Sequence, residues 1–238
     1  MNGLIALLGS GEYLPVMDEV DKYLLANCGA NGHTPRVVCL PTAAGQERES
    51  SWGRWMNMGE EHFTRLGADV KSLPVIDRPS ADDPQYESTI ESADLIYFSG
   101  GNPNYLYQTM NGSRAWSAAQ KAWSRGAAYA GCSAGAMILS ERMPDISLVG
   151  FKTQQAFGIA PATFILPHFD AIPGIWKPVV NALTKRLKEN ESMLGIDEET
   201  ALIGTLGGAW TVHGRQTVSR FTRKGKQVYK VGEEVVIQ

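Results

Sequence analysis

The sequence has few cysteines, no excess of basic charge and no long apolar run, and each absence excludes a class of protein. No stretch reaches the roughly 18 consecutive apolar residues of a membrane-spanning helix. The 22 basic and 25 acidic side chains give a net charge of -3, which argues against a nucleic-acid partner bound through a broad basic face. We therefore predict neither a membrane nor a nucleic-acid partner.

The three cysteines are odd in number and lack C-x-x-C spacing, so we expect no disulfide framework and no cysteine-rich zinc site. Reduced thiols and a cytoplasmic location fit this pattern better. The apolar opening segment, residues 4–8, has no basic lead and ends at a Gly-Ser-Gly turn. We interpret it as a first buried strand and not as a signal peptide.

The composition that remains is that of a compact enzyme-sized domain. Hydrophobic residues make up 43% and charged residues 20% of the 238 positions, which excludes disorder and coiled coils. No internal repeat, low-complexity segment or linker interrupts the chain. We therefore treat residues 1–238 as a single domain.

Short apolar runs alternate with helical periodicity, which predicts a parallel sheet covered by helices on both faces. We expect strands at 4–8, 36–40, 69–76, 94–98 and 127–130, with helices at 15–25, 51–66, 86–92, 104–110, 115–125 and 134–140. After about residue 195, short alternating runs between Gly-containing turns predict antiparallel hairpins that close one edge of the same sheet. The predicted fold class is a three-layer α/β/α architecture with a mainly parallel sheet.

The pentapeptide Gly131-Cys132-Ser133-Ala134-Gly135 is the strongest chemical signal in the chain. It follows a predicted strand and precedes a predicted helix, which is the context of a nucleophile elbow of the form G-x-S-x-G. A Gly-rich turn with an N-capping serine is the alternative. Cysteine is the better intrinsic nucleophile, but the flanking glycines centre the motif on Ser133, so we favour the serine.

A nucleophilic serine needs a base, and four histidines are available. His33 lies in a polar loop, His62 on what looks like the solvent side of a helix, and His213 in a hairpin turn. His168 follows the apolar run 164–167, at the end of a strand, where parallel sheets place active groups. A core histidine satisfied by the backbone is the alternative interpretation of His168.

For the acid that would orient the base, the segment around residues 194–202 offers Asp197, Glu198 and Glu199, and Asp170 is a fourth candidate. Pattern alone does not choose among them. If residues 196–199 continue a strand, side chains alternate, and Glu198 shares a face with Ile196 while its two acidic neighbours face away.

Four motifs together resemble the S51 serine peptidases, the family of aspartyl dipeptidase and cyanophycinase. They are the elbow with Ala136-Met137, Phe98-Ser99-Gly100-Gly101-Asn102, Pro167-His168-Phe169 and Gly195-Ile196-Asp197-Glu198, in the family's order. The resemblance implies a fold similar to class I glutamine amidotransferases, with Ser133 as nucleophile, His168 as base and Glu198 as orienting acid. It also implies an oxyanion loop at Gly100, Gly101 and Asn102, with the N–H groups of Gly101 and Ala134 as donors.

The resemblance further implies a peptidase that forms an acyl-enzyme on small or unusual peptides, without metal or cofactor; a homodimer is left open. The Ser, His, Glu order disfavours an α/β-hydrolase, which would use His213. An esterase or amidase, or a catalytically silent binding protein of the same fold, remains as an alternative. Residues 169–178 lack the arginine expected of either named specificity, and Trp52, Trp55 and Trp176 are candidates for the cleft rim or for core packing.

Overall fold

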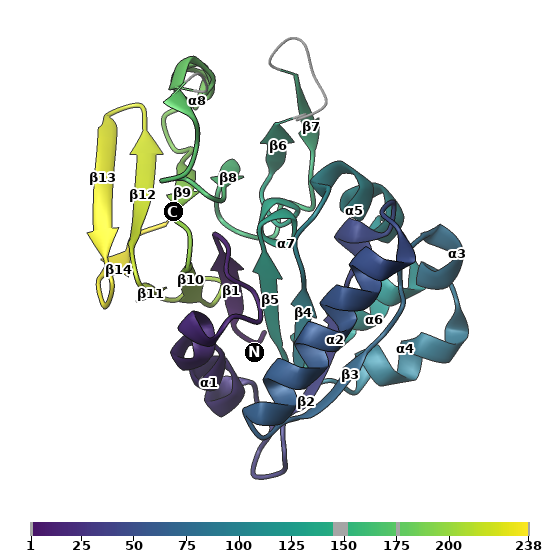
Figure 1. The fold of residues 1–238 in the computed structure, drawn as a ribbon. Helices are drawn as coiled ribbons and strands as arrows, with labels where there is room; N and C mark the ends of the chain where they lie inside the picture. The colour runs from purple at the N-terminus through teal and green to yellow at the C-terminus, as the bar shows by residue number, and fades with distance from the viewer. Residues whose placement is uncertain (1, 145–151, 175–176, 238) are drawn as a thin grey trace.

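The computed structural model describes residues 2–144, 152–174 and 177–237 (Figure 1). Its largest sheet has eight strands in the order β14-β11-β10-β1-β5-β4-β2-β3. The parallel part consists of β1 (Ile5–Leu8), β5 (Ala128–Cys132), β4 (Leu95–Phe98), β2 (Arg36–Leu40) and β3 (Asp69–Ser72). The strands β10 (Thr200–Gly204), β11 (Trp210–Gly214) and β14 (Glu234–Val235) extend it antiparallel beyond β1.

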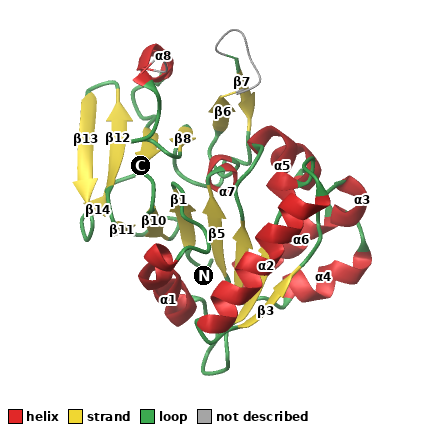
Figure 2. Cartoon of the chain, viewed as in Figure 1, coloured by secondary structure: helices red, strands yellow, loops and turns green. Residues whose placement is uncertain are grey.

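Helices cover both faces of this sheet, as Figure 2 shows, so the predicted three-layer α/β/α architecture is confirmed. One face carries η1 (Pro15–Met17), α1 (Asp18–Asn27) and α2 (Glu49–Arg65); η2 (Thr42–Ala44) precedes α2. The other carries α3 (Arg78–Ala81), α4 (Pro84–Glu91), α5 (Pro103–Met110) and α6 (Arg114–Arg125). Strand residues alternate between two cores, so Ile5 and Leu7 pack with Trp116 while Ala6 and Leu8 pack with Leu24.

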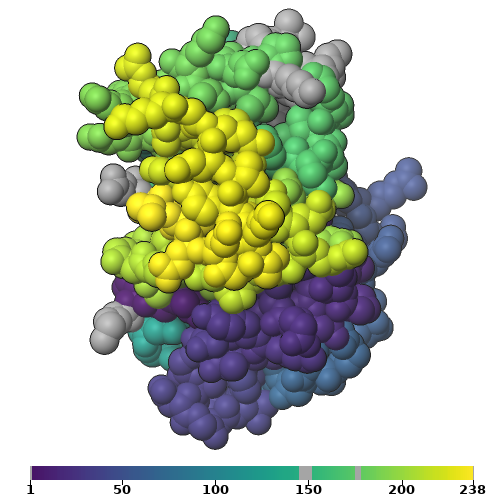
Figure 3. Space-filling view, turned by 90° about the vertical axis from the view of Figure 1, so that its left-hand side faces the viewer, coloured from purple at the N-terminus to yellow at the C-terminus, as the bar shows by residue number. Residues whose placement is uncertain are grey.

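A second, smaller sheet lies beside the first and has the order β13-β12-β9-β8. It contains β8 (Phe164–Leu166), β9 (Met193–Ile196), β12 (Thr217–Thr222) and β13 (Gly225–Lys230), and its apolar residues pack with Leu183 of α8 (Lys177–Arg186). The short hairpin of β6 (Arg142–Pro144) and β7 (Thr153–Gln155) is separate. Figure 3 shows the C-terminal strands gathered above the N-terminal segment on one side of the molecule.

The prediction that the C-terminal hairpins all close one edge of the same sheet is wrong for β12 and β13. Only β10, β11 and β14 join the large sheet. After β11 the chain turns at Gly214, whose φ is 97°, and β12 then pairs with β9 from Val218↔Ile196 to Phe221↔Met193. An alternating pattern fixes which side chains share a face, but it does not identify the partner strand.

The prediction that His62 lies on the solvent side of its helix is also wrong. The residue is 3% exposed, and its Nε2 lies 2.8 Å from Asp21 Oδ2 on α1. Packing of α2 against α1 buries this histidine against Asp21, while its polar neighbours Glu60, Glu61 and Arg65 stay exposed. None of the helices in the described residues is long and apolar enough to cross a membrane.

Candidate active site

The carboxyl ends of three neighbouring parallel strands meet at one edge of the large sheet. Leu8 of β1 pairs with Cys132 of β5, and Phe98 of β4 pairs with Gly131, so the loops that follow these strands lie side by side. They contribute to a cleft of about 360 Å³. The cleft is lined by Glu12, Glu47, Ser51, Arg54, Trp55, Gly100, Gly101, Ser133 and His168.

Ser133 stands at a sharp turn between β5 and α7 (Ala134–Met137), with φ 49° and ψ -105°. The turn needs glycine on both sides because the backbone folds closely on itself. A Cβ on Gly131 would lie 2.3 Å from the Gly135 carbonyl oxygen, and a Cβ on Gly135 would lie 2.8 Å from the Phe98 carbonyl oxygen. The pentapeptide therefore forms the strand–turn–helix elbow that the sequence indicates.

Cys132, the neighbour of Ser133, is fully buried and does not belong to the cleft lining. Its Sγ donates a hydrogen bond to Glu12 Oε2 at 2.9 Å. Burial, and after it the negative charge of Glu12, raise the pKa of the Cys132 thiol well above its ordinary value. The group therefore stays a thiol, the less nucleophilic form of cysteine.

His168 bridges Ser133 and Glu198. Its Nε2 lies 3.1 Å from Ser133 Oγ, and its Nδ1 lies 2.8 Å from Glu198 Oε1. His168 and Glu198 each follow the end of a strand, β8 and β9, which pair in parallel in the small sheet. The large sheet thus supplies the serine, and the small sheet supplies the histidine and the carboxylate.

The acidic neighbours of Glu198 have other partners. Asp197 is 7% exposed and accepts hydrogen bonds from the Thr217 N–H at 3.1 Å and the Thr217 hydroxyl at 2.5 Å. Glu199 pairs with Arg215 at 2.8 Å. The strand ends at residue 196 and residues 198–199 form a turn, so the expected alternation does not place Glu198. The turn itself points its carboxylate at His168.

Asp170 supports this turn from behind. Its Oδ1 accepts the Glu198 N–H at 2.8 Å, and its Oδ2 accepts the Gln216 side-chain amide at 2.8 Å. Burial alone would raise the pKa of Asp170, but the hydrogen bonds from Glu198 and Gln216 outweigh it and lower this pKa below its ordinary value. Asp170 therefore acts on Glu198 through the backbone, and the carboxylate that is hydrogen-bonded to His168 is that of Glu198.

Two members of the predicted oxyanion loop have their N–H groups engaged elsewhere. The Gly100 N–H donates to Glu12 Oε1 at 2.8 Å. The Asn102 N–H donates to the Ala43 carbonyl at 2.8 Å, and the Asn102 side chain caps the N-terminus of α5. These two residues shape the loop, and neither offers a free backbone donor.

The N–H groups of Gly101 and Ala134 have no protein acceptor within the described residues. Gly101 has a φ of 145°, and a Cβ there would lie 2.5 Å from the Ala43 carbonyl oxygen, so glycine is required both by conformation and by space. Ala134 begins α7, where the first N–H groups of a helix are unpaired.

Strained backbone collects around this site. In the described part of the chain, the non-glycine residues with positive φ are Tyr13, Asn31, Ser133, His168 and Glu199. All but Asn31 lie in the cleft lining or next to one of the residues described above. Such conformations cost of order 1–3 kcal/mol each and persist where the surrounding structure holds them, commonly at active sites.

The other histidines lie apart from Ser133. His33 Nε2 contacts Asp94 Oδ2 at 2.8 Å. His213 belongs to β11, its ring lies 4.5 Å from that of Tyr23, and burial lowers its pKa. Among the residues that the structure describes, no group of three His, Cys, Asp or Glu side chains is arranged to hold a metal ion.

The three tryptophans that the sequence suggests for the cleft rim or the core differ in their positions. Trp55 lines the cleft. Trp52 is half-buried on the same helix and is absent from the cleft lining, and Trp176 lies outside the described residues.

Three charged cleft residues were not predicted from the sequence: Glu12, Glu47 and Arg54. Glu12 had a usable signal, because it comes four residues after a strand of the parallel sheet. Glu47 lies two residues before α2 and Arg54 lies in the second turn of this helix, and no motif marks either residue.

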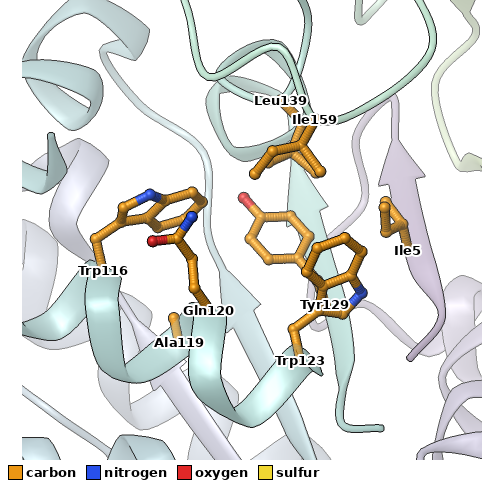
Figure 4. Close-up of a pocket in the computed structure, with 8 residues that line it drawn as sticks. All are labelled: Ile5, Trp116, Ala119, Gln120, Trp123, Tyr129, Leu139 and Ile159. Carbon is orange, nitrogen blue, oxygen red and sulfur yellow. The ribbon is translucent and has the colours of Figure 1, made fainter. Parts of the chain in front are cut away.

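A second cavity, shown in Figure 4, lies between α6 and β5 and is of a different kind. Its volume is about 10 Å³, and its lining is mostly apolar, with Ile5, Trp116, Leu139 and Ile159 among its residues. That volume is at the lower limit for a single water molecule. The cavity is a packing defect of the core and cannot hold a substrate.

Comparison with known proteins agrees with the motifs. Residues 5–209 match the model of peptidase family S51. The chain belongs to this family. The resemblance predicted from the four motifs is thereby confirmed, and the protein is a serine-type peptidase.

The peptidase has relatives among both sequences and solved structures. It is 27% identical over 171 residues to an uncharacterized peptidase, YgaJ, of Bacillus subtilis (strain 168), covering 71% of this chain and 70% of that one. The crystal structure of a peptidase from an acI-B1 Actinobacterium has a TM-score of 0.88 and 36% identity, over 99% and 97% of the two chains. A putative peptidase E protein from Listeria monocytogenes EGD-e has a TM-score of 0.60 and 18% identity, over 98% and 100%, and shares the fold.

Proposed function

We propose that the peptidase hydrolyses short peptides through an acyl-enzyme, with Ser133 as nucleophile, His168 as base and Glu198 as the acid that orients the base. The single observation that carries the proposal is the position of the imidazole. Its two nitrogens lie within hydrogen-bond reach of the serine hydroxyl and of the Glu198 carboxylate. This is the geometry by which a weak hydroxyl nucleophile is activated.

The proposed reaction has two halves. Ser133 Oγ attacks the peptide carbonyl as His168 Nε2 takes its proton, and the resulting oxyanion accepts hydrogen bonds from the Gly101 and Ala134 N–H groups. When the tetrahedral adduct collapses, the C–N bond breaks and His168 gives the proton to the leaving amine. Water then attacks the ester by the same route and releases the acid and free Ser133.

Glu198 and Asp170 keep the imidazole in the required state. A carboxylate on Nδ1 fixes the tautomer that leaves Nε2 free to accept a proton, and it stabilises the imidazolium that forms. The hydrogen bond from the Glu198 N–H to Asp170 holds the turn that carries this carboxylate. Asp170 is thus a positioning residue.

The dimensions of the cleft support a small substrate. A volume of about 360 Å³ lies near the lower end of the range for small-molecule sites, roughly 300–1,000 Å³. A few residues of peptide fill such a space, whereas a folded protein loop would exceed it. We therefore expect dipeptides and other short peptides as substrates.

Comparing kcat/KM on matched substrates tests the proposal. The panel consists of dipeptides, decapeptides that contain the same bond, and p-nitrophenyl esters of the same acyl groups. We expect Ser133-dependent cleavage of the short amides and much slower cleavage of the decapeptides. Hydrolysis of the esters alone would identify an esterase, and no Ser133-dependent turnover of any substrate would identify a binding protein.

A further inference from the structure

A buried carboxylate, Glu12, faces the cleft beside Ser133 without a cation to balance it. The residue is 8% exposed. Its two oxygens accept one N–H, from Gly100, and one S–H, from Cys132, and both of these donors are neutral. Among the described residues, no lysine, arginine or histidine forms an ion pair with it. Buried charges in proteins are normally paired, and each carboxylate oxygen can accept more than one hydrogen bond, so Glu12 has capacity for a cationic partner.

The space between Glu12 and Ser133 is open because residue 100 is a glycine. A Cβ on Gly100 would lie 2.8 Å from Glu12 Oε1 and 3.3 Å from Ser133 Cβ. Gly100 is not among the glycines with positive φ, so the turn itself does not demand glycine at this position. Because residue 100 has no side chain, the Glu12 carboxylate is accessible to a substrate group that lies beside Ser133.

The rest of the cleft lining does not neutralise this charge. Glu47 adds a second, exposed carboxylate, which accepts a hydrogen bond from the Ser51 hydroxyl. Arg54 is the one guanidinium in the lining, and it is exposed to solvent on α2. Glu47 and Arg54 are both exposed and therefore screened by solvent, so the buried carboxylate of Glu12 is the charge that a cationic substrate meets most strongly.

We infer that Glu12 binds a positively charged nitrogen of the substrate residue whose carbonyl Ser133 attacks. The inference rests on the proposed function. Two nitrogens of the substrate have this chemistry. One is the free α-amine, which is two covalent bonds away from the carbonyl carbon, and the other is the ammonium group of a basic side chain. Either donates charge-assisted hydrogen bonds to the carboxylate.

The same contact affects the chemical step. Negative charge on Glu12 opposes the negative charge that develops on the nearby oxyanion, because both lie in a partly buried site where charges are weakly screened. A substrate ammonium at Glu12 offsets this repulsion. Cationic substrates therefore gain in transition-state stabilisation as well as in binding.

Binding to the Ser133→Ala protein, which should not turn its ligand over, tests the inference independently of catalysis. The ligands are lysyl-alanine, norleucyl-alanine and the N-acetyl form of each, titrated by calorimetry. Norleucyl-alanine carries only the α-amine, and N-acetyl-lysyl-alanine carries only the side-chain ammonium. We expect whichever nitrogen is recognised to tighten binding about tenfold to a hundredfold over N-acetyl-norleucyl-alanine, the range for a hydrogen bond to a charged group.

Adding Glu12→Gln to the Ser133→Ala protein should remove most of that preference. The glutamine keeps a carbonyl oxygen for the Gly100 N–H, so the turn retains its hydrogen bond. Glu47→Gln makes the same change of charge at an exposed residue of the cleft lining. It should alter the preference for cationic ligands less than about twofold, because exposed charges are screened. If the preference came only from the overall electrostatic potential of the cleft, the two variants would reduce it to a similar extent.

The inference is overturned if the four ligands bind equally, if none of them binds, or if Glu12→Gln weakens all four by the same factor. The last result would show that Glu12 shapes the cleft for every ligand and does not recognise a substrate cation. Turnover of the same four dipeptides by the unmodified enzyme is a separate measurement. Absence of turnover together with Glu12-dependent binding would reject the proposed peptidase mechanism and leave the cation site standing.

Discussion

The Nε2 atom of His168 lies 3.1 Å from Ser133 Oγ although the two residues follow strands of different sheets. Ser133 follows β5 of the eight-stranded sheet, and His168 follows β8 of the four-stranded sheet. The hydrogen bond from the Phe169 N–H to the Ile196 carbonyl, at 3.0 Å, ties the histidine loop to β9 and so to Glu198. The packing of one sheet against the other therefore sets the distance on which the proposed chemistry depends.

Ser133→Ala should reduce kcat to the background rate while the midpoint of thermal unfolding changes little, because the hydroxyl is half-buried and faces the cleft. Cys132→Ala should retain most of the activity and lose some stability, since it removes a buried side chain that donates to Glu12. Peptide turnover and thermal melts of both variants provide the measurement. An active Ser133→Ala beside a folded but inactive Cys132→Ala would mean that the nucleophile is misassigned.

Glu198→Gln should lower kcat by up to about 10⁴-fold with little change in KM, because the amide cannot fix the imidazole tautomer or stabilise its charge. Glu199→Gln should change kcat only slightly, since Glu199 pairs with Arg215 at the surface. Asp197→Asn should act mainly on stability through the lost hydrogen bonds of Thr217. Steady-state kinetics on the three variants decide the assignment, and equal losses in kcat would refute it.

The pH dependence of kcat/KM should show a rising limb with a single ionisation, because His168 must be unprotonated to accept the Ser133 proton. His168→Gln should lose several orders of magnitude in kcat. His213→Gln should leave the profile nearly unchanged, since His213 is held in β11 against Tyr23. Loss of the rising limb in His213→Gln would point to the α/β-hydrolase order instead.

Local pattern was sufficient for the parallel strands of the large sheet and for the elbow, because buried parallel strands and a tight glycine turn leave short-range signals. It was not sufficient for the placement of β12, whose alternating residues fit either sheet. His62 shows the same limit, since its neighbours Glu60, Glu61 and Arg65 suggest a wet helix face while its real partner, Asp21, is 41 residues away in sequence.

Glu198 illustrates what family resemblance adds to pattern. The motif selected the residue that lies against His168, whereas the argument from strand alternation used a strand that ends at Ile196. Glu12 was overlooked because its importance comes from the register of β1 with β5, which brings the end of the first strand beside the elbow. The position of residue 12 after a predicted strand indicates the correct edge of the sheet, but the register that brings it beside the elbow is a property of the folded sheet.

At neutral pH, Asp170→Asn should lower both the free energy of unfolding and kcat of the peptidase. The pKa of Asp170 is lowered in the folded protein, so its ionisation stabilises the fold above the unfolded-state pKa, about 3.9, and this contribution is lost as pH falls through the lower folded-state value. The difference in unfolding free energy between the two proteins should therefore shrink with acidification. Urea denaturation from about pH 7 to pH 3 measures it, and a difference that is constant with pH would contradict this account.

The central claim is that Ser133 is an activated nucleophile, and covalent labelling with a fluorophosphonate probe tests it most directly. Intact-mass and peptide-mapping spectrometry should find one adduct, on Ser133, in the unmodified enzyme and in Cys132→Ala, and almost none in His168→Gln within the same time. An adduct on any other residue, or labelling of Ser133 at the same rate without His168, would contradict the proposed triad.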